Sequence, residues 1–378
     1  MKWFDTYSSN TLAGSGNQYY FKPMDKEVHR GRIYYRIFAE GTYKYSLLFS
    51  NIIDSTFADG KVSHCNLICP AWDMVQVRAG VCSTCDAVKA AEPRNFQTVT
   101  FGGRENKHVM PGEFFVSDPV MLSAGKGEYL CLEIAFCGEM IPYHEESILP
   151  VFVWENGEWI VSKHVPVPGM IGCDRPVKKR VAFLGDSITQ GCGTPVNAYM
   201  HWNARVADLV GDGYGYWNLG LGWGRAQDAA SDGAWLYKAK QCDAAVVCYG
   251  TNDLGQGRSL EQIQADLLTI VTKLQAAGVK VLLQTVPPFD WEGEQLEKWC
   301  LINTYIREFL AKRADGVFDV VPFLINGPEK YGKTRYCSHP NEAGCAAWAA
   351  ALAPVLKDFL NRESCCKKRF SDKESDSL

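Results

Sequence analysis

The stretch VAFLGDSITQG, residues 181–191, decides the fold of the second half of this chain. Four apolar residues closed by a glycine are typical of a buried strand in a parallel sheet, and the residues that follow lead towards a helix. Ligands bind at this edge of open α/β sheets. Ser187 therefore stands either in an active site, beside a helix N-terminus that favours developing negative charge, or merely as the cap of that helix.

The sequence around this stretch alternates strand and helix patterns. Apolar runs predict strands at 181–184, 216–219, 244–249, 279–284 and 316–320, and helical periodicity predicts helices at 260–277, 294–314 and 341–360. Strands that alternate with helices indicate a parallel sheet covered on both faces.

The first half has a different pattern. Short strand-like runs, among them 32–37, 45–50 and 130–136, are separated by glycine and proline turns, which predicts a β-sandwich or jelly roll. We therefore expect an all-β accessory domain at 1–175 and an α/β domain at 178–362. Residues 363–378 are mostly charged or serine and are expected to form a loose tail.

The amino-acid composition argues against some classes of binding partner. The net charge of -4 over 378 residues argues against nucleic acid and against an anionic membrane surface, because both need a basic face. No apolar run approaches a membrane-spanning length, and the N-terminus lacks the apolar core of a secretory signal. The 15 cysteines then read as reduced thiols of a cytoplasmic protein.

Four cysteines form two close pairs that loosely resemble a zinc ribbon. They are Cys65, Cys69, Cys82 and Cys85. The first pair is spaced one residue wider than the second, and the gap between the pairs is shorter than a ribbon usually has. Free thiols are the expectation, and a zinc site is the alternative.

Three more segments with unusual residues follow predicted strands or precede helices. The glycine-rich segment 220–225 would let the backbone approach a ligand, or is a flexible loop. In segment 250–253, Asn252 offers an amide donor and Asp253 a brace or cap, although both residues also suit a plain turn. His339 precedes the last helix, on a loop.

The small number of histidines in the α/β half favours His339 as the base. A serine hydroxyl becomes a useful nucleophile only beside a base of near-neutral pKa. The α/β half contains only His201 and His339. His201 is expected within a helix, where packing or exposure is the simpler role, so His339 is the better candidate.

These four segments, in this order, resemble the blocks of the SGNH (GDSL-type) serine hydrolase superfamily. The resemblance covers about residues 178–360 and implies a flavodoxin-like, three-layer parallel-sheet domain. The first half resembles, less closely, the β-rich domain that precedes the catalytic domain in some bacterial members.

The resemblance also implies a mechanism. Ser187 would be the nucleophile and His339 the base, with Asp186 and Asp253 in supporting roles. The oxyanion would be held by the Ser187 N–H, the Asn252 amide and one backbone N–H of the glycine segment. Gly222 is the expected third donor, with Trp223 and Gly224 as alternatives. Acyl transfer of this kind needs no metal or organic cofactor.

Two departures from the family pattern stand out. Counted from Asn218, the family's oxyanion glycine falls at Trp223. The family's aspartate, three residues before the histidine, is Tyr336 here. A backbone carbonyl, Glu329 or Glu342 is then left to orient His339, or Ser187 and His339 act as a dyad.

The leading functional prediction is a serine esterase that removes short acyl groups, above all acetyl, from a carbohydrate. The alternatives are a lipase, lysophospholipase or thioesterase on longer chains, and a non-catalytic carbohydrate-binding relic of a hydrolase. The expected partner is a small-molecule or oligosaccharide ester, and self-association into a homo-oligomer stays open.

Overall fold

The computed structural model describes residues 7–12, 16–23, 27–54, 67–86, 92–144, 148–231 and 234–362. The expected tail at 363–378 and Cys65 of the cysteine cluster lie outside these residues.

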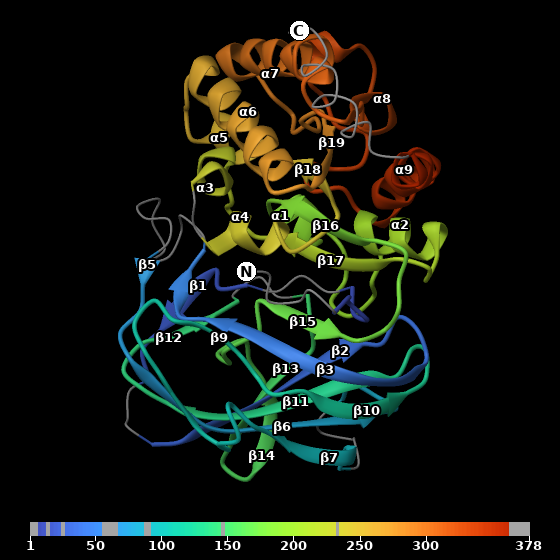
Figure 1. Cartoon of the computed structure of the whole chain (residues 1–378). Coiled ribbons are helices and arrows are strands. Elements are labelled where there is room, and N and C mark those ends of the chain that lie inside the picture. Colours follow the sequence, from blue (N-terminus) through green and yellow to red (C-terminus); the bar gives the residue numbers. More distant parts are fainter. Residues whose placement is uncertain are drawn as a thin grey trace, which may run out of the picture.

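Two antiparallel sheets face each other in the first half (Figure 1). The larger sheet has the order β14-β13-β2-β11-β6-β7, with β8 paired to β6, and the smaller has the order β10-β3-β15, with β9 paired to β3. Two short strand pairs, β1 with β12 and β4 with β5, lie beside them. The strands are β1 Tyr19–Phe21, β2 His29–Arg36, β3 Gly41–Ser50, β4 Ile52–Ile53, β5 Leu67–Ile68, β6 Trp72–Cys82, β7 Arg94–Val99, β8 Lys107–Val109, β9 Phe114–Val116, β10 Val120–Ala124, β11 Tyr129–Cys137, β12 Ile141–Tyr143, β13 Val151–Glu155, β14 Glu158–Val161 and β15 Met170–Cys173.

Residues 45–50 of β3 and all of β15 are buried on both faces of the smaller sheet. Tyr45, Leu47 and Phe49 of β3 pack in the core that the larger sheet shares. Leu48 points the other way and packs with the α/β half. Since successive side chains of a strand alternate between faces, an unbroken run of buried residues is what a strand between two layers requires.

The second half is a five-stranded parallel sheet in the order β17-β16-β18-β19-β20. Its strands are β16 Arg180–Gly185, β17 Gly215–Gly220, β18 Ala244–Cys248, β19 Lys280–Gln284 and β20 Gly316–Phe318. Its helices are α1 Ser187–Gln190, α2 Trp202–Val210, α3 Ala226–Ala230, α4 Ala234–Ala239, α5 Thr251–Gly255, α6 Leu260–Ala276, α7 Gly293–Glu308, α8 Val321–Leu324 and α9 Glu342–Asn361, with short 3₁₀ turns at Leu310–Lys312 and Glu329–Tyr331.

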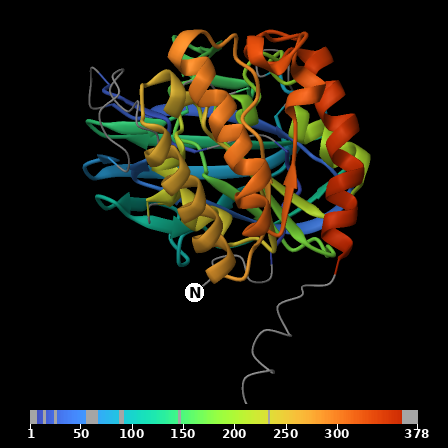
Figure 2. The same cartoon turned by 90° about the horizontal axis from the view of Figure 1, so that it is seen from above.

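Helices cover both faces of this sheet. Side chains of α2 and α9 pack with Val181 and Phe183 on one face. Side chains of α3, α4, α6 and α7 pack with Ala182 and Leu184 on the other. Viewed from above, the yellow-to-red helices lie over the blue-to-green strands of the first half (Figure 2).

A buried ion pair joins the two halves. Lys238 on α4 lies 2.8 Å from Asp54, which follows β4, and both side chains are 0% exposed. The linker residue Arg175 is also buried and donates to the carbonyl oxygens of Ser9 and Tyr214. The halves therefore share polar as well as apolar contacts.

Helix α9 is the one described helix long and apolar enough to cross a membrane, so the expectation that no run approaches that length was wrong. Half of its most apolar window is buried inside the protein, against α2 and the sheet. The core helix of a folded domain passes the same test, so this is weak evidence for a membrane span.

Candidate active site

Ser187 and His339 meet at the carboxyl edge of the parallel sheet. The Ser187 Oγ lies 2.9 Å from the His339 Nε2, although the two residues are 152 positions apart in the chain. Ser187 is the first residue of α1, directly after β16, and His339 stands on the loop before α9. The two residues thus have the spacing that proton transfer from hydroxyl to imidazole needs.

The turn before Ser187 leaves no room for a larger residue. A Cβ on Gly185 would lie 2.6 Å from the Cys248 carbonyl oxygen and closer still to Thr189. Asp186 caps α1 by accepting a hydrogen bond from the Ile188 N–H, at 3.0 Å. The strand therefore delivers Ser187 to a fixed position on the first turn of a helix, where N–H groups have no intrahelical acceptor.

Burial, with no opposing carboxylate, sets the protonation of His339. Partial burial lowers its pKa from the usual value of 6.5. In the described residues, no carboxylate forms a hydrogen bond or ion pair with its ring. The ring of Phe289 stands edge-on to it, with the centroids 5.4 Å apart. The imidazole is therefore neutral and ready to accept a proton near pH 7.

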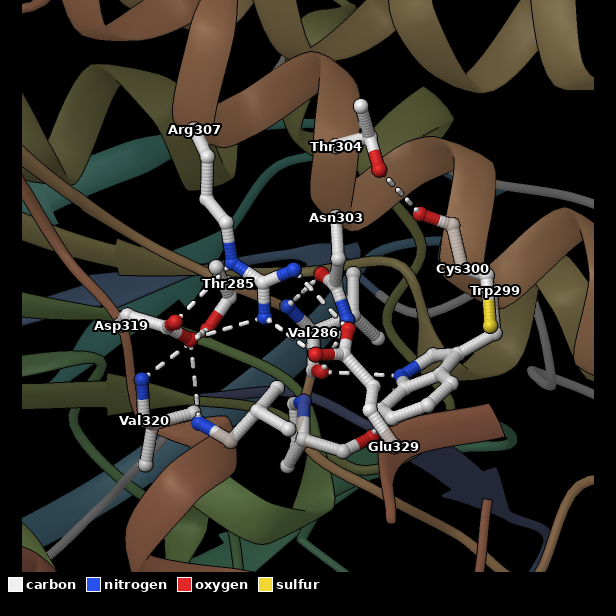
Figure 3. A network of polar contacts seen from close by, with 12 residues as sticks. Thr285, Val286, Trp299, Cys300, Asn303, Thr304, Arg307, Asp319, Val320 and Glu329 are labelled. Atoms are coloured by element: carbon white, nitrogen blue, oxygen red, sulfur yellow. Dashed lines mark hydrogen bonds and ion pairs between the residues drawn. The ribbon is translucent and has the colours of Figure 1, made fainter. Parts of the chain in front are cut away.

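The carboxylates considered as the orienting acid lie elsewhere. Glu329 forms an ion pair with Arg307, at 2.9 Å (Figure 3). Glu342 is exposed on the first turn of α9. Neither carboxylate forms a hydrogen bond or ion pair with His339 within the described residues. Tyr336, at the position of the family's aspartate, packs beside Gly344 and Arg335.

Asp290 holds the histidine loop instead. Its carboxylate accepts hydrogen bonds from the Thr334 N–H and hydroxyl, each at 2.9 Å, and from the Ser338 hydroxyl at 3.1 Å. Burial works to raise the pKa of Asp290, but these hydrogen bonds outweigh it and leave the pKa below its usual value. Ser338 directly precedes His339, so this clasp fixes the base through its backbone.

The segment that carries Phe289 and Asp290 is itself anchored at its beginning (Figure 3). Asn303 of α7 both donates to and accepts from the backbone of Val286, at 3.0 and 2.7 Å. The Trp299 indole donates to the Val286 carbonyl at 2.9 Å. These contacts pin the chain three residues before the ring that touches His339.

Two of the three candidate backbone donors in the glycine segment are engaged within the protein. The Gly222 N–H donates to the Gln190 side-chain oxygen at 2.6 Å, and the Gly224 N–H donates to the Leu221 carbonyl at 3.0 Å. Both amides are thus engaged within the protein, which counts against Gly222 and Gly224 as oxyanion donors. Trp223 between them has φ +63°, a left-handed backbone that glycine adopts easily.

Asn252 lies against the same segment. Its side-chain amide donates to the Gly224 carbonyl at 3.0 Å. An amide group carries two N–H donors, so this bond orients the group and leaves the second hydrogen for a ligand.

Two buried carboxylates stand behind the site. Burial raises the pKa of Asp186 to about 7, with the charge of Asp253 adding to the effect. Burial also raises the pKa of Asp253 to about 6, although its carboxylate accepts the Ala226 N–H at 2.8 Å. Both residues therefore brace backbone, and neither contacts His339.

His201 is the N-cap residue of α2, at the start of the helix in which it was expected, and it is fully buried. Its Nε2 lies 3.2 Å from the Leu12 carbonyl oxygen, and burial lowers its pKa to about 4. It packs against the first half, as a structural histidine does.

Sequence reasoning missed several residues around the site. Gly193 lies so close to His339 that an added Cβ would come within 3.0 Å of it. Gln190 and Asp290 were missed because their contacts reach segments that are distant in the sequence. Only Gln190, three residues after Ser187, was near enough in sequence to attract attention.

The described residues contain no cluster of three or more histidine, cysteine, aspartate or glutamate side chains that could hold a metal ion. Cys69, Cys82 and Cys85 are free thiols. Because Cys65 lies outside the described residues, the zinc alternative is not tested.

The Ser187–His339 pair thus lies at the carboxyl edge of a five-stranded parallel sheet. Residues 183–347 match the GDSL-like Lipase/Acylhydrolase family. This part of the chain is therefore a GDSL-like lipase/acylhydrolase domain.

The chain is also similar to named proteins. It is 25% identical over 253 residues to an acetylxylan esterase of Xylanibacter ruminicola, an alignment that covers 58% of this chain and 49% of that protein. The chain therefore spans about half the length of this curated relative.

Two solved structures are similar at lower identity. A family two carbohydrate esterase from Clostridium thermocellum matches 94% of this chain and 98% of its own, at 14% identity and a TM-score of 0.41. A member of the lipolytic G-D-S-L family from Veillonella parvula matches 46% of this chain and 96% of its own, at 19% identity and a TM-score of 0.38.

Proposed function

We propose that the protein is a serine esterase that removes short acyl groups, above all acetyl, from a carbohydrate. The observation that carries the catalytic part is the 2.9 Å contact between the Ser187 Oγ and the His339 Nε2. His339 takes the hydroxyl proton as Ser187 attacks the ester carbonyl, and then gives that proton to the departing alcohol. Water then attacks the acyl-enzyme with His339 again as the base, which releases the carboxylic acid and regenerates the Ser187 hydroxyl.

We assign the developing oxyanion to three donors. They are the Ser187 N–H at the start of α1, the second N–H of the Asn252 amide and the backbone N–H of Trp223. Support for Trp223 comes from its position, which is that of the family's oxyanion glycine, and from its glycine-like φ of +63°. Donors held in place before the reaction lower the barrier because no reorganisation is needed when charge develops.

The carbohydrate part of the proposal rests on aromatic residues near the site and on the similarity to an acetylxylan esterase. The Trp223 side chain is 38% exposed, as a surface for a sugar ring would be. A pocket of about 450 Å³ lies along the segment that follows Phe289 and is lined by Trp291 and Tyr331 among others.

Chain-length preference tests this function. We expect turnover of p-nitrophenyl esters to fall steeply from acetyl to palmitoyl, and acetylated oligosaccharides to release acetate. Ser187→Ala should abolish both activities, and Asn252→Ala should lower kcat by about 10²–10³. A preference for long chains would point instead to the lipase or thioesterase alternative. Sugar binding without ester cleavage would point to the non-catalytic one.

Some finer features also belong to the proposal. The strand order supports a flavodoxin-like sheet, in which the first strand lies between the second and third, and the paired antiparallel sheets support a jelly roll. We keep the domain limits at 1–175 and 178–362. A cytoplasmic location is likewise proposed, and fractionation of the source cells tests it.

A further inference from the structure

The outer face of the larger antiparallel sheet carries arginine and tryptophan side chains. Successive side chains of a strand point to opposite faces of the sheet. On β2, Ile33 and Tyr35 lie in the core between the two sheets, so Arg30 points outwards. On β13, Val153 lies in the same core, so Trp154 points outwards as well. Figure 1 shows the larger sheet on the side of the smaller sheet that is away from the parallel sheet.

Arg30 is stacked on two indole rings of this outer face. It stands opposite Trp154, because the register pairs the neighbouring residues Gly31 and Val153. The guanidinium carbon of Arg30 lies 4.7 Å from the ring centroid of Trp154 and 5.2 Å from that of Trp159. The two indoles meet edge to face, with their centroids 5.2 Å apart. Such stacking occupies the flat face of a guanidinium and leaves its in-plane N–H groups for hydrogen bonds.

These N–H groups of Arg30 have no acceptor in the described part of the chain. The side chain forms no hydrogen bond or ion pair with the described residues, and its Nε is buried without a partner. Arg32, two residues further along β2, is different, because its Nε lies 2.7 Å from the carboxylate of Glu133. A buried donor without an acceptor is costly, so Arg30 calls for an anion that these residues do not supply.

The surroundings of Arg30 are open and partly apolar. Trp154 is 39% exposed, and Val161 on the adjacent strand β14 is 81% exposed. On the other side of β2, the residue opposite Arg30 is Ala135, whose side chain is too short to cover a guanidinium. An exposed indole face takes the flat side of a sugar ring, and a guanidinium takes a carboxylate through two parallel N–H bonds. A sugar that carries a carboxylate satisfies both groups at once.

We propose that the outer face of the larger sheet binds an acidic polysaccharide, with Arg30 paired to the carboxylate of a uronic acid residue and Trp154 stacked on a sugar ring. This inference goes beyond the proposed function, because the site uses neither Ser187 nor His339. The net charge of -4 gives the chain no general attraction for anions, so the pairing at Arg30 must supply the preference. Binding at this face holds the protein on a polymer and raises the effective concentration of ester groups at the other half.

Isothermal titration calorimetry of the full chain with tetragalacturonate tests this proposal. The comparison ligand is the neutral tetrasaccharide obtained when its carboxyl groups are reduced to alcohols. We expect the wild type to bind the acidic ligand at least about tenfold more tightly than the neutral one, because hydrogen bonds to charged groups are strong. Arg30→Gln should remove this difference. Trp154→Ala should weaken the binding of both ligands by about tenfold, because the stacking surface is lost.

Arg104→Gln is the matched control, since Arg104 is an exposed arginine of the same half whose side chain has no ring or acidic partner among the described residues. It should leave both affinities unchanged. Equal losses in Arg104→Gln and Arg30→Gln would show a general attraction of charge and overturn the inference, as would equal wild-type affinities for the two ligands. If Arg30→Gln does not fold, wild-type affinities in Trp154→Ala overturn it. Tighter binding of tetraglutamate than of tetragalacturonate would assign the site to acidic peptides and also overturn it.

Discussion

At the scale of single residues, the described contacts hold His339 by packing against Phe289 and not by a carboxylate. Acids that orient a catalytic histidine also stabilise its charged form and raise its pKa. Here burial lowers the pKa of His339 from 6.5. The ring is held by its bond to Ser187 and by the edge of Phe289.

The pH profile follows from this environment. The base must be neutral, so kcat/KM should rise with pH through a midpoint below 6.5 and be flat near pH 7. Initial rates on p-nitrophenyl acetate from pH 4 to 8 measure it. Because burial raises the pKa of Asp186 to about 7, Asp186→Asn is the control, and its profile should keep the midpoint. A midpoint above 7 would show that an anion supports the imidazolium.

A substitution at Trp223 distinguishes the role of its backbone N–H from the role of its indole side chain. A non-glycine residue with left-handed φ costs roughly 1–2 kcal/mol. Trp223→Gly removes this strain and keeps the N–H, so kcat on p-nitrophenyl acetate should stay within about threefold of wild type. KM for acetylated oligosaccharides should rise, because the indole is lost. A large fall in kcat with the small ester would mean that the side chain shapes the reacting geometry.

At the scale of elements, sequence predicted what depends on local pattern. Apolar runs located the five parallel strands. The segments after two of these strands and the loop before the last helix drew attention to Ser187, Asn252 and His339, and the structure brings Ser187 and His339 within 2.9 Å. Contacts between segments that are distant in the chain could not be predicted from the sequence. Whether Glu329 reaches His339 depends on Arg307 of α7, which captures it. The engagement of the Gly222 N–H depends on a side chain of another element.

The hydrogen bonds of Asp290 to Thr334 and Ser338 fix the loop that carries His339, a task that the orienting aspartate performs in the family pattern. Asp290→Ala should free the 334–338 loop and lower kcat about tenfold with KM nearly unchanged, because loosened geometry costs mainly the transition state. Asp290→Asn keeps an acceptor oxygen and tolerates φ +56°, so it should restore most of the rate. Steady-state kinetics of both variants measure these changes in kcat and KM. Equal kcat in Asp290→Ala and wild type would show that the loop is held without the clasp.

At the scale of the whole molecule, the two halves are built as one unit. Residues 45–50 of β3 and the strand β15 are buried between the larger sheet and the α/β half. The Asp54–Lys238 pair seals the junction with no exposed charge. Burial raises the pKa of Asp54 and the attraction of Lys238 lowers it, so removal of the lysine would leave a carboxylate that pays the full cost of desolvation.

Removal of one partner of this pair should therefore destabilise the entire chain. We expect Lys238→Met to lower the free energy of unfolding by about 3–5 kcal/mol, and addition of Asp54→Asn to recover part of the loss. Lys298→Met is the control, since Lys298 pairs with Glu294 on the surface of α7 and should change stability by about 0.5 kcal/mol at most. Urea titration followed by tryptophan fluorescence measures all three. If Lys238→Met costs no more than the control, the junction does not depend on this pair.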